Sequence, residues 1–236
     1  MENFTTTFGN SAAQAAPIER AAFIRKTYIY LAAAILAFVA VEGFLFASGA
    51  AGAILSVISA AGSMGWLLVL GAFMGISYLA NRWAMSDTSS ATQHLGLLLY
   101  VVAEAVIFVP MIAMAIYYSG DASVLGKAGI VTFGLFLGLS LTVFITRTDF
   151  SFLGPILAIG GFVALGFIIA SALFGFSLGS IFAFVMVAFA GTAILYQTSN
   201  ILHQYNTKQH VAASLALFAS IALLFWYILS IFSSRD

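Results

Sequence analysis

Long apolar runs separated by short polar segments make up most of this chain. Each run has about 20 residues, the length that crosses the hydrocarbon core of a bilayer as an α-helix. Only helices and closed barrels can cross a bilayer, and these runs lack the alternating segments of about 10 residues that build a barrel. The pattern predicts an all-α integral membrane protein with about seven transmembrane helices, near residues 27–49, 65–83, 95–117, 127–146, 152–174, 179–201 and 210–232.

Two parts of this pattern leave alternatives open, and a third part contains two spans. Residues 50–64 are apolar but rich in small side chains, so they form either a short interfacial helix or an extension of the neighbouring helices. Residues 150–207 contain no Asp, Glu, Lys or Arg and are too long for one span, and the glycines of GFSLG at 175–179 indicate the turn between two spans. The last apolar run is either a full span or a re-entrant segment, which decides the side on which the C-terminus lies.

The composition indicates that lipid, not water, surrounds most of the chain. Of the 236 residues, 63% are hydrophobic and 7% are charged, whereas a soluble domain carries about 25% charged residues. A soluble fold of this length could not hide so much apolar surface. The formal net charge is zero, so no basic surface for nucleic acid is expected. The chain has no cysteine, which excludes disulfides and thiolate metal sites.

The charged residues predict a domain boundary and an orientation. Residues 1–26 form a polar tail of mixed charge, and residues 27–236 form a single seven-helix membrane domain. The apolar run after Lys26 continues to about Ala51, which exceeds the apolar region of about 7–15 residues in a signal peptide, so we expect a retained helix. Lys and Arg favour the cytoplasmic side. They divide six to two and predict a cytoplasmic N-terminus, with Arg20, Arg25, Lys26, Arg82, Arg147 and Lys208 inside and Lys127 and Arg235 outside.

Two pairs of glycines are spaced by four residues, Gly71/Gly75 and Gly134/Gly138. Such pairs let two membrane helices approach closely. We expect these pairs to pack helices within the bundle rather than to form a dimer interface.

Two carboxyl groups are predicted to lie inside the membrane. Glu42 lies about two-thirds along the first run, and Glu104 lies near the middle of the third. An ionisable group at the centre of a membrane helix costs about 2.5–3.5 kcal/mol on insertion scales, so such groups are functional candidates by default. Each could face an aqueous cavity, pair with a base or remain protonated. Pro110 removes the hydrogen bond to the Val106 carbonyl and predicts a kink near Glu104, where carboxyl and carbonyl oxygens could hold a cation. The alternative is a protonated glutamate that hydrogen-bonds a neighbouring helix.

A second polar cluster lies at residues 197–210, where the sixth run ends. Gln197 and Asn200 are three residues apart and share a helix face, and the simplest interpretation is a helix end whose side chains satisfy terminal carbonyls. His203 and His210 make a weak metal pair, because no carboxylate or third ligand accompanies them. No Walker-type loop and no H-E-x-x-H motif is present, and all four aspartates lie in loops or at the terminus. We therefore expect no enzymatic activity and no cofactor.

Three segments together resemble the bacterial branch of the Bax inhibitor-1 family. They are FIRKTYIYLAAAILAF at 23–38, TRTDFSFLGPIL at 146–157, and ILYQTSNILHQYNT with the final run at 194–232. The likeness covers nearly the whole chain, and the DFSFLG loop and the last two runs are its most specific parts. The resemblance implies six helices around a central, more polar seventh. It also implies an inner-membrane protein that in some relatives is a pH-sensitive calcium leak.

The family's proton sensor is a pair of aspartates that a basic residue latches, and this chain departs from that pattern. The first aspartate falls on Gln197, and the second falls near Ser220, with Ala219 and Ile221 as neighbouring alternatives. The latch falls near Arg82. Neither Gln197 nor Ser220 titrates near neutral pH, so the family's pH switch is not expected. Glu104 is then the first candidate for cation binding or proton sensing, and Glu42 is the second.

Three hypotheses of function follow. The first is a passive calcium or cation leak in the inner membrane, with Ca²⁺ as the transported ion. The second, also implied by the resemblance, is a regulator or substrate of a membrane-bound AAA protease, for which the polar N-terminal tail is a plausible handle. The third is a scaffold that assembles with other membrane proteins and tolerates loss of both carboxyls. The lipid bilayer is the partner common to all three.

Overall fold

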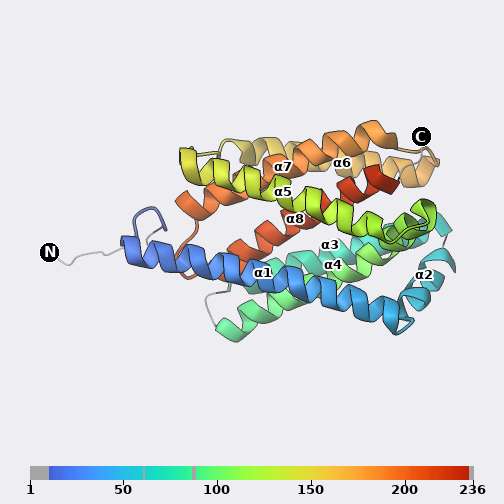
Figure 1. Cartoon of the computed structure of the whole chain (residues 1–236), viewed down its shortest axis with the longest axis horizontal. Helices are drawn as coiled ribbons and strands as arrows, with labels where there is room; N and C mark the ends of the chain where they lie inside the picture. Colours follow the sequence, from blue (N-terminus) through green and yellow to red (C-terminus); the bar gives the residue numbers. More distant parts are fainter. Residues whose placement is uncertain (1–10, 61, 87–88, 234–236) are drawn as a thin grey trace.

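Eight α-helices run along one bundle in the computed structural model, which describes residues 11–60, 62–86 and 89–233. Seven of these helices are long and apolar enough to cross a membrane, which confirms the predicted class. Within the described residues there is no strand, only one isolated antiparallel bridge between Ser11 and Asn206. The helices are α1 (Pro17–Ala47), α2 (Ala50–Ala60), α3 (Gly62–Ala84), α4 (Ser90–Ser119), α5 (Ser123–Thr146), α6 (Leu153–Phe174), α7 (Gly179–His203) and α8 (His210–Ser233) (Figure 1).

Local sequence explains several helix ends. Pro17 begins α1, a position where the backbone N–H has no partner within the helix, so proline loses no hydrogen bond there. The helix thus begins ten residues before the predicted first span. The Ser89 hydroxyl caps α4 by accepting the Thr92 amide at 3.1 Å. Residues 50–60 form the separate short helix α2. Gly49 and Gly62 flank it with φ of 81° and 57°, a left-handed backbone that suits glycine.

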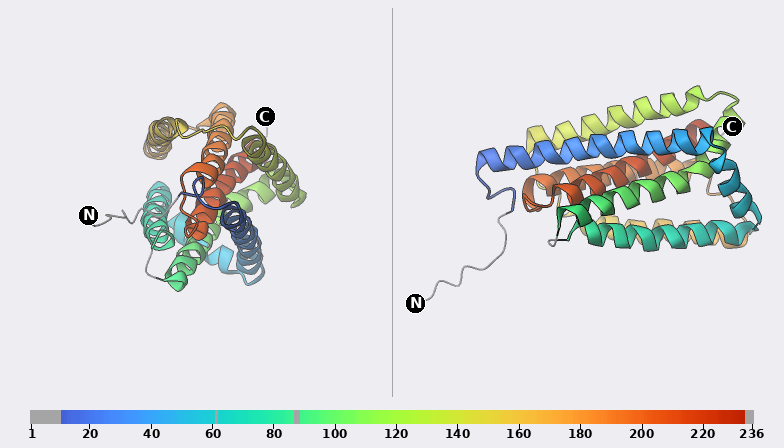
Figure 2. Two further views of the ribbon diagram at one scale, coloured as in Figure 1. Left: turned by 90° about the vertical axis from the view of Figure 1, so that its left-hand side faces the viewer. Right: turned by 90° about the horizontal axis from the view of Figure 1, so that it is seen from below.

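The helix α8 lies inside the bundle, as the predicted central seventh span requires. It packs against α1, α3, α4, α5 and α7, and Figure 2 (left) shows it (red) among these helices. Its 24 residues span about 36 Å at 1.5 Å per residue, more than a hydrocarbon core of about 30 Å. The last run is therefore one continuous helix that is long enough to cross a membrane. The helix α6 packs on α3 and α7 instead of on α8, so it lies at the outside of the bundle.

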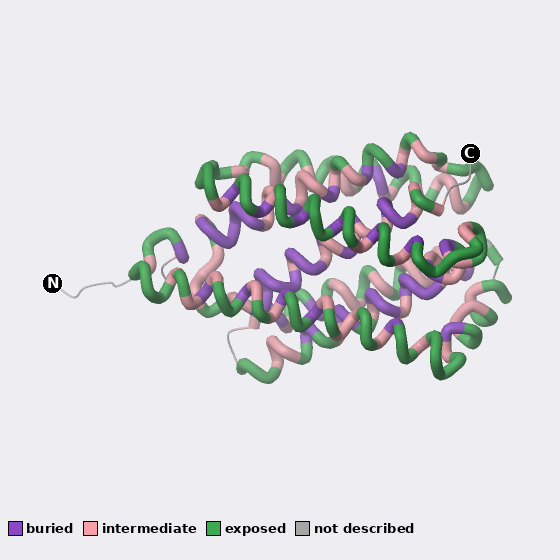
Figure 3. Tube along the Cα trace, in the orientation of Figure 1, coloured by how far each residue is buried: buried purple, intermediate pink, exposed green. Residues whose placement is uncertain are grey.

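Burial follows this arrangement. Buried positions concentrate on α4 and α8, whereas Ala164 is the one buried residue among those described in α6 (Figure 3). Exposed side chains on the outer helices are largely apolar, as expected where lipid contacts them. Phe108 is a central contact, with its ring stacked 5.8 Å from Phe225 and edge-on 4.9 Å from Trp226.

The glycine pairs do not produce the close packing that the sequence predicts. A Cβ built on Gly71, Gly75, Gly134 or Gly138 would meet nothing within 4 Å, so this expectation is wrong for contacts within the chain. The closest approach to backbone among the described glycines lies instead at Gly96 of α4, where a Cβ would stand 2.6 Å from the Ala80 carbonyl oxygen of α3, and a Cβ on Gly160 would stand 2.8 Å from the Phe189 ring. Spacing identifies candidate glycines, but the helix face that meets a neighbour decides which of them matter.

The charged residues gather as the helix order predicts. The N-terminal end of the bundle carries the start of α1, the end of α3, the α5–α6 loop and the α7–α8 loop (Figures 1 and 2). Arg20, Arg82, Arg147 and Lys208 belong to these segments, and Lys127 lies near the other end. Arg235 and residues 1–10 of the predicted tail lie outside the described residues.

Candidate functional site

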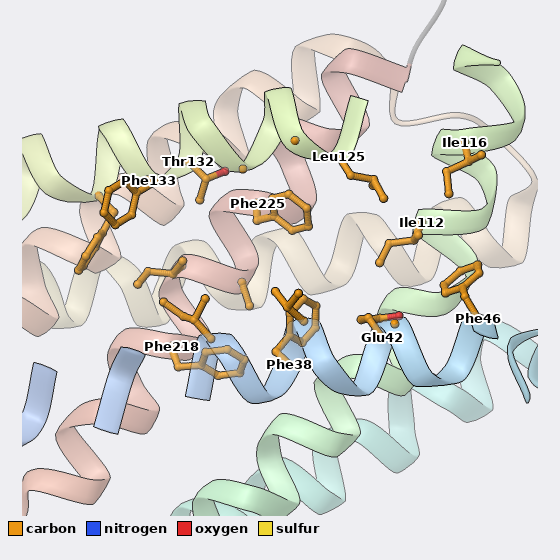
Figure 4. Close-up of a pocket in the computed structure, with 18 residues that line it drawn as sticks. Phe38, Glu42, Phe46, Ile112, Ile116, Leu125, Thr132, Phe133, Phe218 and Phe225 are labelled. Atoms are coloured by element: carbon orange, nitrogen blue, oxygen red, sulfur yellow. The ribbon is translucent and has the colours of Figure 1, made fainter. Parts of the chain in front are cut away.

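Glu42 faces a large apolar cavity on one side of α8. The cavity has a volume of about 590 Å³ and is lined by α1, α4, α5 and α8. The Glu42 side chain is 7% exposed, and neither of its carboxyl oxygens has a hydrogen-bond partner in the described structure. Figure 4 shows the Glu42 side chain on α1 between Phe38 and Phe46, on the side of the helix that faces Ile112. A buried carboxyl without a partner is energetically unfavourable, so its retention here needs an explanation.

Glu104 faces a second cavity, of about 500 Å³, on another face of α8. This cavity is lined by α3, α4, α6, α7 and α8, and Glu104 is 6% exposed. The Tyr100 hydroxyl, one helical turn earlier on α4, lies near the Glu104 carboxyl. The Oε2 atom of Glu104 has no hydrogen-bond partner among the described residues. The setting is thus aromatic, with Trp66, Trp226 and Tyr227 also lining the cavity.

The two carboxyls do not share a site. Phe218 and Phe225 of α8 line the Glu42 cavity, whereas Trp226 and Tyr227 line the Glu104 cavity, so opposite faces of one helix separate them. In the part of the chain that the structure describes, no group of three or more His, Cys, Asp or Glu residues could hold a metal ion. The helix α4 continues through Pro110 as one element of 30 residues. Each carboxyl is therefore a single acidic group in an apolar cavity.

Gln197 and Ser220, the positions that the resemblance aligns with an aspartate pair, are not joined by a hydrogen bond between described residues. Ser220 is buried, and its hydroxyl donates to the Ala216 carbonyl of its own helix at 2.9 Å. Gln197 is half-buried on α7, and Arg82 is exposed at the end of α3. No hydrogen bond or ion pair between described residues connects Arg82 with either position. Next to Gln197, the fully buried Thr198 approaches Ser140 of α5, with 3.4 Å between their hydroxyl oxygens.

Sequence reasoning missed a polar clasp that joins the α5–α6 loop to the end of α7. The buried Ser199 hydroxyl accepts the Phe150 amide at 2.8 Å and lies 3.4 Å from Asp149 Oδ1. His203 Nδ1 lies 3.0 Å from the Ser199 carbonyl oxygen. The Ser151 backbone amide, which donates to Asp149 at 2.9 Å, holds the pKa of that carboxyl below its usual range. The DFSFLG and YQTSNILH segments are polar interruptions in the sequence, but only the fold pairs them.

The two histidines of the weak metal pair have different surroundings. His203 belongs to the clasp, whereas the His210 ring lies 5.1 Å from the Tyr30 ring of α1. His94 stacks on the same tyrosine and lies 2.8 Å from its hydroxyl. These contacts account for the histidines as packing and hydrogen-bonding groups.

The GFSLG segment at 175–179 fits the G-x-S-x-G pattern of a nucleophile elbow, but its setting is different. That elbow is a strained turn from a strand into a helix, whereas these residues connect α6 with α7 and Ser177 is exposed. The glycines serve the turn, since Gly175 and Gly179 have φ of 72° and 68°. The match gives no catalytic site by itself.

The segment before α1 is anchored to the α7–α8 loop. The Ala12 amide donates to the Tyr205 carbonyl at 2.8 Å, and Ser11 forms the isolated bridge with Asn206. Ala12 is fully buried. Burial also raises the pKa of the Tyr205 phenol to about 12. The chain that precedes α1 is therefore held at one point on the end of the bundle.

Comparison with known proteins places this arrangement in a family. The family model described as inhibitor of apoptosis-promoting Bax1 matches residues 20–236. An uncharacterized protein of Pseudomonas aeruginosa is 32% identical over 173 residues, which cover 70% of this chain and 72% of that protein. Bax inhibitor 1 of Schizosaccharomyces pombe is 30% identical over 173 residues, covering 70% and 61% respectively. The modulator of FtsH protease YccA of Escherichia coli is 31% identical over 179 residues, covering 74% and 78%. This multi-pass membrane protein therefore belongs to the Bax inhibitor-1 family.

Proposed function

We propose that this protein is a regulator or substrate of a membrane-bound AAA protease in the inner membrane. The similarity to a protein named as a modulator of FtsH protease supports this function. A second relative, also 31% identical, is named as an inner membrane protein. The six basic residues that are predicted to lie on the same side of the membrane as the N-terminus favour a cytoplasmic position for that end.

The anchored N-terminal segment is the observation that carries the proposal. Ser11 and Ala12 are fixed to the α7–α8 loop, and the ten residues that precede them, MENFTTTFGN, contain one charged side chain. A processive protease begins at chain ends, and a terminus is protected to the extent that its backbone is hydrogen-bonded and buried. We infer that residues 1–10 engage the protease, while the contact between Ala12 and Tyr205 limits further entry.

Two variants test this proposal in cells that contain the protease. Deleting residues 2–10 leaves Ser11, Ala12 and α1 in place, so it removes the handle without removing the anchor. We expect a longer protein half-life and weaker co-purification with the protease. Ala12→Glu keeps the handle but forces a charge into a fully buried position, so we expect a shorter half-life. Equal half-lives of the deletion variant and the wild type, with equal co-purification, would refute the role of the tail.

A passive cation leak is the second candidate, and the two buried carboxyls favour it. Glu104 and Glu42 each face a cavity within the predicted membrane depth. The test is calcium flux into proteoliposomes from about pH 6 to pH 8, with wild type beside Glu104→Gln and Glu42→Gln. A leak that uses Glu104 loses its flux, or the pH dependence of that flux, in Glu104→Gln. Absence of flux in the wild type at every pH would remove this candidate and leave the regulatory function.

A further inference from the structure

The Glu42 cavity opens sideways through the surface of the bundle. The helices α1 and α5 both pack on α8, and they meet each other at the Tyr28 ring of α1, which lies 6.4 Å from Phe136 and 5.8 Å from Phe144 of α5. Val39 and Phe46 of α1 and Phe133 of α5 line the cavity and are themselves partly or largely exposed. Because these exposed side chains are apolar, the opening faces the lipid rather than either aqueous side. A molecule that enters here comes from the bilayer.

Glycines keep the interior of this cavity open. Gly43 of α1 and Gly126 and Gly129 of α5 line the cavity, and a Cβ on any of them would meet nothing within 4 Å. None of the three has a left-handed backbone, so the backbone at these positions does not require glycine. Figure 4 shows the side chains of Leu125 and Thr132, on the same helix as Gly126 and Gly129, directed into the cavity. Larger side chains at the glycine positions would therefore fill part of the cavity.

The chemistry of the lining is one acid surrounded by phenyl rings. Glu42 is the only charged side chain among the described residues that line it. Thr132, the one hydroxyl, is already bonded to the Ala128 carbonyl at 2.8 Å. The remaining lining is apolar and includes six phenylalanines, Phe38, Phe46, Phe133, Phe136, Phe218 and Phe225. No protein group therefore satisfies the Glu42 carboxyl in the described structure.

This combination selects among ligand classes. A divalent cation takes about six to eight oxygen ligands, and one carboxyl cannot supply them. An anion would meet the acid unfavourably, and a pure hydrocarbon would leave the carboxyl unpaired. An ammonium group satisfies both features, because it donates to the carboxyl and is attracted to the faces of the surrounding rings.

We propose that the cavity between α1, α4, α5 and α8 binds a lipophilic amine, with the ammonium group at Glu42 and the apolar body between the phenylalanines. The volume of about 590 Å³ is within the range of about 300–1,000 Å³ that small-molecule sites occupy. The ligand reaches the site from the membrane through the opening between α1 and α5. This site is separate from the N-terminal segment that carries the proposed protease contact.

Decylamine is a suitable probe, with decanol as its uncharged counterpart of equal chain length. The purified full-length protein is held in maltoside micelles, which contain no amine, and the dissociation constant is obtained from the rise in melting temperature with ligand concentration. We expect saturable binding of decylamine by the wild type and at least about tenfold weaker binding of decanol, where a factor of ten is about 1.4 kcal/mol.

Three variants locate the site. Glu42→Gln should weaken decylamine binding at least about tenfold, to the level of decanol. Glu104→Gln removes the carboxyl of the other cavity and is the matched control, so it should bind decylamine like the wild type. Gly129→Phe fills the cavity and leaves Glu42 in place, so it should weaken the binding of both probes.

Two results would overturn the proposal. The first is equal decylamine affinity of the wild type and Glu42→Gln, and the second is decanol binding as tight as decylamine binding. Either would mean that the cavity is occupied by lipid chains without selection for an amine. Neither result depends on calcium flux or on protein half-life, so the test is independent of both proposed functions.

Discussion

The contact between α3 and α4 at Gly96 predicts a large effect from the smallest possible side-chain addition. In Gly96→Ala the new Cβ would stand 2.6 Å from the Ala80 carbonyl oxygen, 2.8 Å from the Ala84 amide nitrogen and 3.0 Å from the Trp83 Cβ. Two of these three atoms belong to the backbone, so no side chain can rotate away. The helices must separate by at least about 0.4 Å, because real Cβ contacts essentially never fall below 3.0 Å.

The magnitude follows from two opposing effects. Overpacking of a well-packed interior costs about 1–3 kcal/mol, and we expect the upper part of that range because backbone must move. Replacing glycine by alanine inside a helix returns up to about 1 kcal/mol. The net effect of Gly96→Ala on the free energy of unfolding is therefore a loss of about 2 kcal/mol.

Gly134→Ala is the matched control, because it makes the same chemical change where a Cβ meets nothing within 4 Å. It keeps the gain in helix propensity and has no overpacking, so its stability should equal or exceed that of the wild type by up to about 1 kcal/mol. The two variants then differ by about 3 kcal/mol, which for soluble chains of about this length corresponds to about 6–12 °C in melting temperature.

Thermal unfolding in one detergent, with all three proteins measured side by side, is the assay. Melting of Gly96→Ala at or above the wild-type temperature would refute the close approach of α3 and α4. Destabilisation of Gly134→Ala by more than about 1 kcal/mol would contradict the open space that a Cβ at this position meets in the described structure.

Two further predictions concern the clasp between the α5–α6 loop and α7. Ser199→Ala leaves the Phe150 amide without its 2.8 Å acceptor, so we expect a loss of about 1–3 kcal/mol in thermal unfolding. Thr142→Ala removes only an exposed bond within α5 and should melt like the wild type; equal melting of both variants would contradict the clasp. The lowered pKa of Asp149 stabilises the fold above the unfolded carboxyl value of about 3.9, and this stabilisation disappears as the pH falls through the folded value. Wild type should therefore melt above Asp149→Asn at about pH 7 with a gap that narrows below about pH 4, and a constant gap would contradict the shift.

The membrane class and the number of spans could be predicted from the sequence because hydropathy is a local property. A run of about 20 apolar residues implies a helix across the bilayer whatever its neighbours are. The depth of Glu42 and Glu104 followed from their places within such runs, and the structure finds both buried. The separation of α2 also has a local cause, in the glycines at positions 49 and 62.

Which residues meet was decided by the tertiary structure alone. The sequence placed Glu42 and Glu104 together as one class of candidate, but α8 separates them into two cavities with different aromatic linings. It predicted close packing at evenly spaced glycines, whereas the closest approach in the described part of the chain is at Gly96, and Gly160 also lies close to Phe189. The bond between Ser199 and Phe150 joins residues 49 positions apart. Hydrophobic periodicity is weak evidence for such contacts in a chain surrounded by lipid, because lipid-facing and buried positions are both apolar, and only the packing of the helices distinguishes them.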